Sequence, residues 1–96
     1  MIRGLADATT ADIWNGINSK AARRIPRELW SAIQRKLDQI DAVGAVEDLG
    51  VPPGNRLHAL RGDLAGYHAI RVSDQYRIVF RFERGNAFDV RCTDYH

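Results

Sequence analysis

The hydrophobic pattern of this chain changes period near its middle, and this change limits the possible folds more than any other feature. Before residue 44, apolar residues recur at the 3.6-residue spacing of an amphipathic helix. After the Pro-Pro-Gly-Asn run at 52–55, apolar and polar residues alternate, as they do in strands with one buried face. The sequence therefore predicts an α+β fold in which two N-terminal helices pack on a small, mostly antiparallel sheet.

The two helices are expected at residues 8–18 and 26–42. Asp7 and Thr10 supply side-chain oxygens that favour a helix start just before the first apolar stripe. Pro26 suits the first turn of the second helix, because its missing N–H costs nothing there. The stripe of the second helix comprises Leu29, Trp30, Ile33, Leu37 and Ile40. A connection follows, with one helical turn expected near residues 46–49.

The second half predicts four strands joined by short turns, which can only connect antiparallel neighbours. The expected strands are residues 56–60, 67–72, 76–83 and 87–93, and the turns are 61–63, 73–75 and 84–86. Residues 2–6 are short and apolar, which is compatible with an edge strand. The helix pair is the only cover available for the apolar sheet face, so Arg77 and Arg81 are expected on the opposite face.

The length of 96 residues predicts a single domain over 1–96, and 45% hydrophobic with 27% charged residues is ordinary for a globular protein. No apolar run approaches the roughly 18 residues of a membrane span. Asp7 interrupts the start before a signal-peptide core can form. The single cysteine, Cys92, excludes an internal disulfide and a cysteine-based zinc cluster. A reducing, cytoplasmic setting is therefore expected.

The basic residues are nearly all arginine, and their excess lies in the second half. Twelve of the 14 basic residues are arginine, and residues 53–96 hold 7 basic and 5 acidic side chains together with all three histidines. Arginine binds phosphate through a fixed fork of donors, which suits a nucleic-acid partner. Codon bias in a GC-rich genome produces the same composition, so composition alone leaves both interpretations open.

No common catalytic motif is present: the chain lacks GxGxxG, a Walker A loop and HExxH, and its histidines stand singly, so no metal site is expected. What remains is a cationic sheet face with titratable groups near it, namely His58, Arg77 and His96. Such a set can cleave RNA without metal. A base takes the 2′-hydroxyl proton, the oxygen attacks the phosphate, arginine stabilises the charge, and an acid protonates the leaving oxygen.

Each of these residues also has an ordinary structural interpretation. A histidine in mid-strand is usually a hydrogen-bonded structural residue, and a histidine at a chain end is usually frayed and idle. Arg77 and Arg81 fit a solvated face with cross-strand acidic partners. The basic connector before the second helix fits a solubilising surface.

Several segments in order resemble a known family. They read Arg-Leu-His-Ala-Leu-Arg-Gly-Asp at 56–63, Gly-Tyr-His-Ala-Ile-Arg-Val at 66–72, Gln-Tyr-Arg-Ile-Val-Phe at 75–80, Ala-Phe-Asp-Val at 87–90 and Asp-Tyr-His at 94–96. Over essentially the whole chain, this set resembles the HigB toxins of the RelE/ParE superfamily of bacterial toxin–antitoxin systems. The resemblance implies the RelE-like fold, which agrees with the pattern of helices and strands.

The resemblance also implies an activity and partners. It implies a ribosome-dependent endonuclease that enters the A site and cuts messenger RNA during translation, without a metal ion or other cofactor. It implies a HigA-like helix-turn-helix antitoxin that inhibits the toxin and represses the operon, so that operator DNA is contacted only through the antitoxin.

The catalytic residues that the resemblance implies are His58, Arg77, Asp94, Tyr95 and His96. His58 matches the Leu-His-x-Leu motif, Arg77 would stabilise the phosphate in the transition state, and His96 would be the acid or the base. RNA-binding candidates are Arg23, Arg24, Arg56, Arg61 and Arg81. Which residue is the acid and which the base stays open at this point.

Two other functions compete with the nuclease. One is a ParE-like poison that binds DNA gyrase and cuts nothing, although ParE-type proteins lack the terminal Asp-Tyr-His. The other is an RNA-binding or regulatory member that has lost cleavage. A basic face binds phosphate without sequence preference, so RNA binding alone does not distinguish these functions from catalysis.

Overall fold

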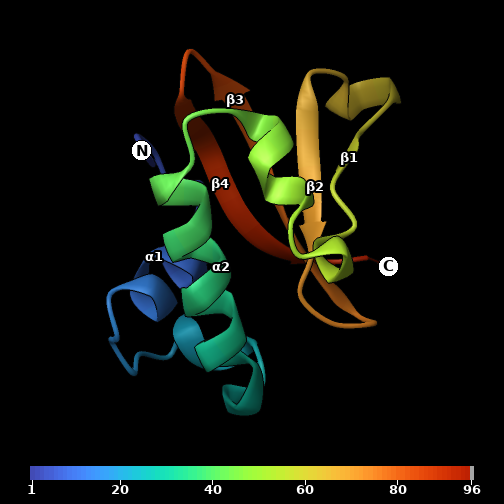
Figure 1. The fold of residues 1–96 in the computed structure, drawn as a ribbon. Helices are drawn as coiled ribbons and strands as arrows, with labels where there is room; N and C mark the ends of the chain where they lie inside the picture. Colours follow the sequence, from blue (N-terminus) through green and yellow to red (C-terminus); the bar gives the residue numbers. More distant parts are fainter. Residues whose placement is uncertain (96) are drawn as a thin grey trace.

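The computed structural model describes residues 1–95, and it places two helices on one face of a four-stranded sheet (Figure 1). The helices are α1 (Ala8–Trp14) and α2 (Trp30–Ala42). The strands are β1 (His58–Ala59), β2 (Tyr67–Arg71), β3 (Tyr76–Glu83) and β4 (Asn86–Asp94). They lie in the order β1-β2-β3-β4, and all neighbours are antiparallel. The expected α+β meander is confirmed.

Both helices are shorter than their sequence patterns predict. The Asp7 carboxylate accepts a hydrogen bond from the Thr10 backbone N–H at 2.8 Å, as expected for a helix cap. Helix α1 nevertheless ends at Trp14, because Gly16 adopts a left-handed conformation with φ +74° and turns the chain away. Helix α2 starts after a 3₁₀ turn at Arg27–Leu29 instead of directly at Pro26. Within residues 1–95, no helix has the length and apolar character needed to cross a bilayer.

Strands β2, β3 and β4 match the expected bounds within one residue at each end, whereas β1 is much shorter than the predicted 56–60. Two 3₁₀ turns, Val46–Gly50 and Pro53–Asn55, precede β1, so the Pro-Pro-Gly-Asn run is itself helical. Arg56 then takes a left-handed conformation with φ +48°, which redirects the chain and delays the start of pairing to His58. The predicted turn after this strand is instead a longer connection that contains a 3₁₀ turn.

The N-terminal segment lies along the outer edge of β4, as an edge strand would, but it runs parallel to it. Ile2 and Leu5 form isolated parallel bridges with Ala87 and Val90, respectively. The backbone N–H of Arg3 donates to the carbonyl of Ala87 at 2.8 Å. The edge of β4 is thereby paired by the chain itself.

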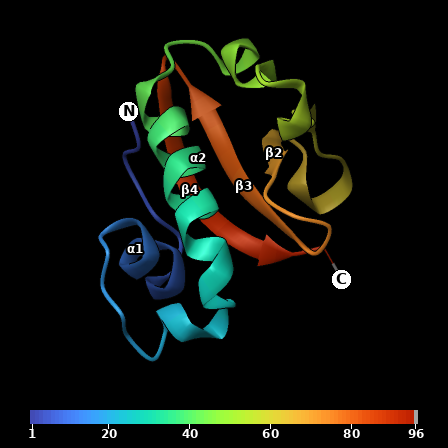
Figure 2. The same cartoon turned by 60° about the horizontal axis from the view of Figure 1, so that its bottom comes forward.

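The core lies between the helices and the sheet, as Figure 2 shows from below. Its fully buried members are Ile13, Ala22, Ile33, Leu37, Ile40, Leu49, Ile70, Ile78, Phe80, Ala87 and Val90. Thr10 is also fully buried, and its hydroxyl accepts a hydrogen bond from the Cys92 backbone N–H at 2.9 Å. This bond ties α1 directly to β4 and satisfies a buried polar group on each side.

The Cys92 thiol should react only when the protein unfolds. Burial first, and the negative charge of Asp7 second, raise the pKa of Cys92 to about 12. Because the thiolate is the reactive form, we expect a colorimetric thiol reagent at pH 8 to label the native protein far more slowly than the urea-unfolded protein. Equally fast labelling in both states would show that β4 opens readily from the core.

A β-bulge in β4 changes which side chains reach the second face of the sheet. Val79 pairs with Arg91, but Arg81 pairs with Phe88, so β4 has one residue more than β3 over this stretch. Asp89 absorbs the extra residue in a left-handed conformation with φ +53°. The bulge puts Phe88 on the same face as Arg81, whose guanidinium lies 4.8 Å from the centre of its ring.

Candidate functional site

The sheet face opposite the helices, called here the open face, carries the expected cationic residues in register. Paired residues on antiparallel strands share a face. The first row across the strands is Arg71, Arg77 and Thr93; the second is His58, Ala69, Val79 and Arg91; the third is Tyr67, Arg81 and Phe88. Ala69 and Val79 are fully buried at the centre, so this face is more than a solvated surface.

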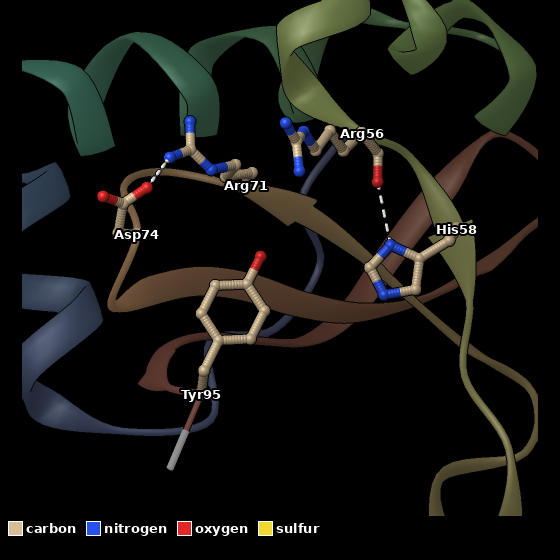
Figure 3. Close-up of a pocket in the computed structure, with 5 residues that line it drawn as sticks. All are labelled: Arg56, His58, Arg71, Asp74 and Tyr95. Atoms are coloured by element: carbon tan, nitrogen blue, oxygen red, sulfur yellow. Dashed lines mark hydrogen bonds and ion pairs between the residues drawn. The ribbon is translucent and has the colours of Figure 1, made fainter.

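One end of the open face holds a depression of about 420 Å³ (Figure 3). Its lining residues are Arg56, His58, Arg71, Asp74 and Tyr95. They come from the segment before β2, the last residue of β2, the turn after β2 and the residue after β4. The fold thus brings together an imidazole, two guanidinium groups and a phenol from sequence positions far apart.

The His58 side chain is oriented as a proton acceptor. Its Nδ1 lies 2.8 Å from the backbone carbonyl oxygen of Arg56, which can only accept a hydrogen bond. Nδ1 must therefore carry the proton in this contact, and the neutral ring keeps a free lone pair on Nε2. Figure 3 shows the His58 ring at the depression, and within residues 1–95 its Nε2 has no hydrogen-bond partner. The arrangement suits a general base that acts through Nε2.

Arg77 lies beside this depression, under the ring of Tyr95. Its guanidinium carbon is 5.1 Å from the centre of that ring, a cation–π contact. The Arg77 Nε is buried and has no hydrogen-bond partner among the described residues. Because this atom is shielded from solvent, a bound anion could reach it only after neighbouring side chains moved.

The Tyr95 ring points its hydroxyl into the depression toward Arg56 and Arg71 (Figure 3). One face of the ring meets Arg77, and the hydroxyl edge meets the cavity. Tyr95 is tied to the sheet by its backbone N–H, which donates to the Gln75 carbonyl at 2.8 Å. The residue therefore has a defined position just beyond β4.

A buried asparagine fixes the loop that delivers Arg56 and His58. Asn55 is fully buried, and its amide donates to the Gln39 side chain and to the Leu49 carbonyl, both at 3.0 Å. Its Oδ1 accepts a hydrogen bond from the Lys36 ammonium group. Two of these partners lie on α2, so the helix sets the position of the loop.

Replacing Asn55 by alanine should therefore destabilise the protein by about 2–3 kcal/mol, because three buried or half-buried groups lose their partners. The melting temperature checks this, with Asn18→Ala as the matched control. Asn18 is exposed, and its loss should cost less than about 0.5 kcal/mol. Equal melting temperatures for the two variants would contradict the role of Asn55.

The remaining predicted site residues lie outside the depression. Asp94 pairs with Tyr76, which packs against the core, so strand alternation directs it to the helix side of the sheet. Its carboxylate accepts a hydrogen bond from the Gln75 side chain at 2.9 Å. Arg61 is exposed in the connection after β1. His96 lies outside the described residues.

The other RNA-binding candidates are farther away. Arg81 belongs to the third row of the open face, stacks on Phe88 and pairs with Glu83 at 2.7 Å. Arg23 and Arg24 lie in the 3₁₀ turn between the helices, across the molecule from β1 (Figure 1). The depression therefore unites His58, Tyr95 and Arg56 but not these three arginines.

Sequence reasoning missed Arg71 and Asp74, which line the depression. A signal for Arg71 was present. The turn expected at 73–75 is centred on residue 74, so Arg71 and Arg77 are equidistant from it and must pair across the hairpin. An arginine expected on the open face at 77 therefore implies a second one beside it at 71.

Comparisons with known proteins agree with this structure. A family model described as the RelE-like toxin HigB of type II toxin–antitoxin systems matches residues 17–96. "Toxin HigB-1" of Vibrio cholerae is 43% identical over 72 residues, which cover 75% of this chain and 76% of the relative. "Endoribonuclease HigB" of Proteus vulgaris is 33% identical over 66 residues, or 67% of this chain and 72% of the relative.

Solved structures share the fold at low sequence identity. A chain of the YoeB–YefM complex from Staphylococcus aureus has a TM-score of 0.61 at 18% identity, and the match covers 100% of this chain and 95% of that one. Escherichia coli YafQ has a TM-score of 0.59 at 13% identity and covers 99% and 92%, respectively. The RelE-like architecture implied by the sequence is confirmed.

Proposed function

The chain belongs to the HigB family of RelE-like toxins of type II toxin–antitoxin systems, and we propose that it cuts messenger RNA in the ribosomal A site without a metal ion. The Proteus vulgaris relative carries the name of an endoribonuclease, which supports ribonuclease activity in the family. The observation that carries the proposal here is the free Nε2 of His58, held in a depression lined by two arginines.

The proposed reaction begins when His58 Nε2 takes the proton of a ribose 2′-hydroxyl. The freed oxygen attacks the adjacent phosphorus, a bond to the 5′-oxygen of the next nucleotide breaks, and a 2′,3′-cyclic phosphate remains. Arg77 stabilises the negative charge that builds up on the phosphate oxygens through its guanidinium group. The leaving 5′-oxygen takes a proton from an acid, a role that we assign to His96, which the family resemblance implies as either the acid or the base.

Asp94 and Tyr95 then have different roles. The Tyr95 ring covers Arg77 and its hydroxyl faces the depression, so Tyr95 positions the arginine and contacts RNA. Asp94 is hydrogen-bonded to Gln75 and holds the end of β4 in place. In this proposal it supports the chain end instead of contacting the reacting phosphate.

Membership of a toxin–antitoxin family implies an antitoxin as partner, and the YoeB structure in complex with YefM illustrates such a pair. We propose a HigA-like helix-turn-helix antitoxin for this chain, with operator DNA reached only through it. The ribosome and messenger RNA are the targets, so the cytoplasm is the place of action.

The proposal is tested by inducing the untagged protein in bacteria and mapping the 5′ ends of one abundant message. New ends inside translated codons, absent when translation initiation on that message is blocked, are the expected result. Growth arrest with intact messages would refute the nuclease and favour a gyrase poison. Folded protein without growth arrest would indicate a member that has lost its activity.

A further inference from the structure

We propose that Arg71 and Arg56 bind a second RNA phosphate, next to the one attacked at His58, and that the Asp74 carboxylate occupies part of this site until RNA displaces it. This inference rests on the proposed function and identifies an additional contact with its substrate. Three observations carry it: the placement of the two arginines, the surrounding positive charge and the exposure of Asp74.

Arg56 and Arg71 both line the depression, along the same edge in the view of Figure 3, although they come from different elements. Arg71 ends β2, and Arg56 is the left-handed residue between the 3₁₀ turn Pro53–Asn55 and β1. Within the described residues, the Arg56 side chain makes no hydrogen bond or ion pair. The two arginines thus have only one carboxylate beside them, that of the exposed Asp74. This excess of positive charge favours the binding of an anion.

A third cation, Lys36 on α2, lies close enough to Arg71 for the two charges to interact. Burial lowers the pKa of Lys36, and the nearby guanidinium groups of Arg35 and Arg71 lower it further. Lys36 donates its hydrogen bond to the neutral amide of Asn55, so this contact does not neutralise its charge. A phosphate at Arg71 would thus be attracted by Lys36 as well.

Asp74 is the group that RNA would replace. It forms an ion pair with Arg71, and its side chain is 100% exposed, whereas that of Arg71 is 31% exposed. An exposed pair of this kind contributes little to stability, because water screens it. A phosphate presents the same two-oxygen edge to the arginine fork as a carboxylate does. Asp74 therefore competes with the phosphate.

The position of Arg71 matches a neighbouring phosphate along one strand of RNA. His58 pairs with Ala69, and Arg71 is two residues farther along β2. Two residues of a strand span about 7 Å, which is on the scale of one nucleotide step. An RNA strand that places its cleaved phosphate at His58 and Arg77 can then place the next phosphate between Arg71 and Arg56.

The test is a titration of the isolated ¹⁵N-labelled protein with a trinucleotide of 2′-O-methyl RNA, which cannot be cleaved because its nucleophile is blocked. We expect the side-chain Nε–H signals of Arg56 and Arg71 to shift together and to saturate. Arg71→Gln should weaken binding about tenfold and flatten the dependence of log K on log salt by roughly 0.7. Arg84→Gln, which removes the same charge at the β3–β4 turn, should change the affinity less than twofold.

Asp74→Asn gives the sharper result, because it should strengthen binding about threefold, and this gain should vanish in the double variant with Arg71→Gln. An equal gain in the double variant would mean that Asp74 acts only through net charge, and it would overturn the site. Absence of a saturable shift at Arg56 and Arg71 would overturn it too. If messages are still cut in that case, the proposed function survives alone; shifts without cleavage keep the site and refute the nuclease.

Discussion

Replacing His58 by glutamine is expected to reduce message cleavage by about 10²–10⁴-fold, the usual contribution of a general base. Glutamine keeps a polar group of similar size near the Arg56 carbonyl, but it cannot accept and release a proton near neutral pH. His58 is exposed, so the free energy of unfolding of the variant should differ from that of the parent protein by less than about 0.5 kcal/mol. The measurement is the fraction of one message cut within translated codons per amount of folded protein.

His68→Gln is the matched control for this experiment. His68 is on the neighbouring strand β2 but on the helix side, where its ring stacks on Phe80 with 6.2 Å between centroids. Its replacement should change stability and leave cleavage per folded molecule within about threefold, because no reacting group touches it. If His58→Gln cleaves messages as well as this control does, His58 is not the general base.

The sequence predicted the parts of the fold that depend on local periodicity. The bounds of strand β3 are predicted correctly, because apolar and polar residues alternate along it and its two faces differ strongly in polarity. The helix ends and β1 were placed less well. The end of α1 and the start of β1 depend on the left-handed conformations of Gly16 and Arg56, and the start of α2 on the 3₁₀ turn Arg27–Leu29. The apolar pattern carries no signal for any of these.

The sequence predicts some of the residues that line the depression but not their geometry. The sequence predicts His58 and Tyr95 as site residues, and both line the depression. The direction of the His58 ring could not be predicted, because it depends on one carbonyl group in a bent loop. The bulge at Asp89 was equally hidden, since an extra residue in a strand leaves no periodic signal. The Asp-Tyr-His motif groups Asp94 with Tyr95, whereas the alternation of side chains along β4 directs Asp94 to the helix side of the sheet.

Replacing Arg77 should have an effect as large as replacing His58. Arg77→Ala is expected to lower cleavage by about 10²–10³-fold, since it removes a preorganised charge at the phosphate. Arg77→Lys keeps the charge but loses the planar fork and the stack on Tyr95, so it should recover only a small part of the activity. Arg84→Lys serves as the control, because it makes the same change at an exposed turn.

Tyr95 variants can show whether the stack itself positions Arg77. Tyr95→Phe keeps the ring over the guanidinium group and removes only the hydroxyl, whereas Tyr95→Leu removes the cation–π contact as well. If the ring positions Arg77, the leucine variant should approach the activity of Arg77→Lys, and the phenylalanine variant should retain much more. Combining Tyr95→Leu with Arg77→Ala should then add little further loss, because residues that act as a unit are not additive. Additive losses would mean that Tyr95 contacts RNA independently, and Arg77 would then owe its position to the strand alone.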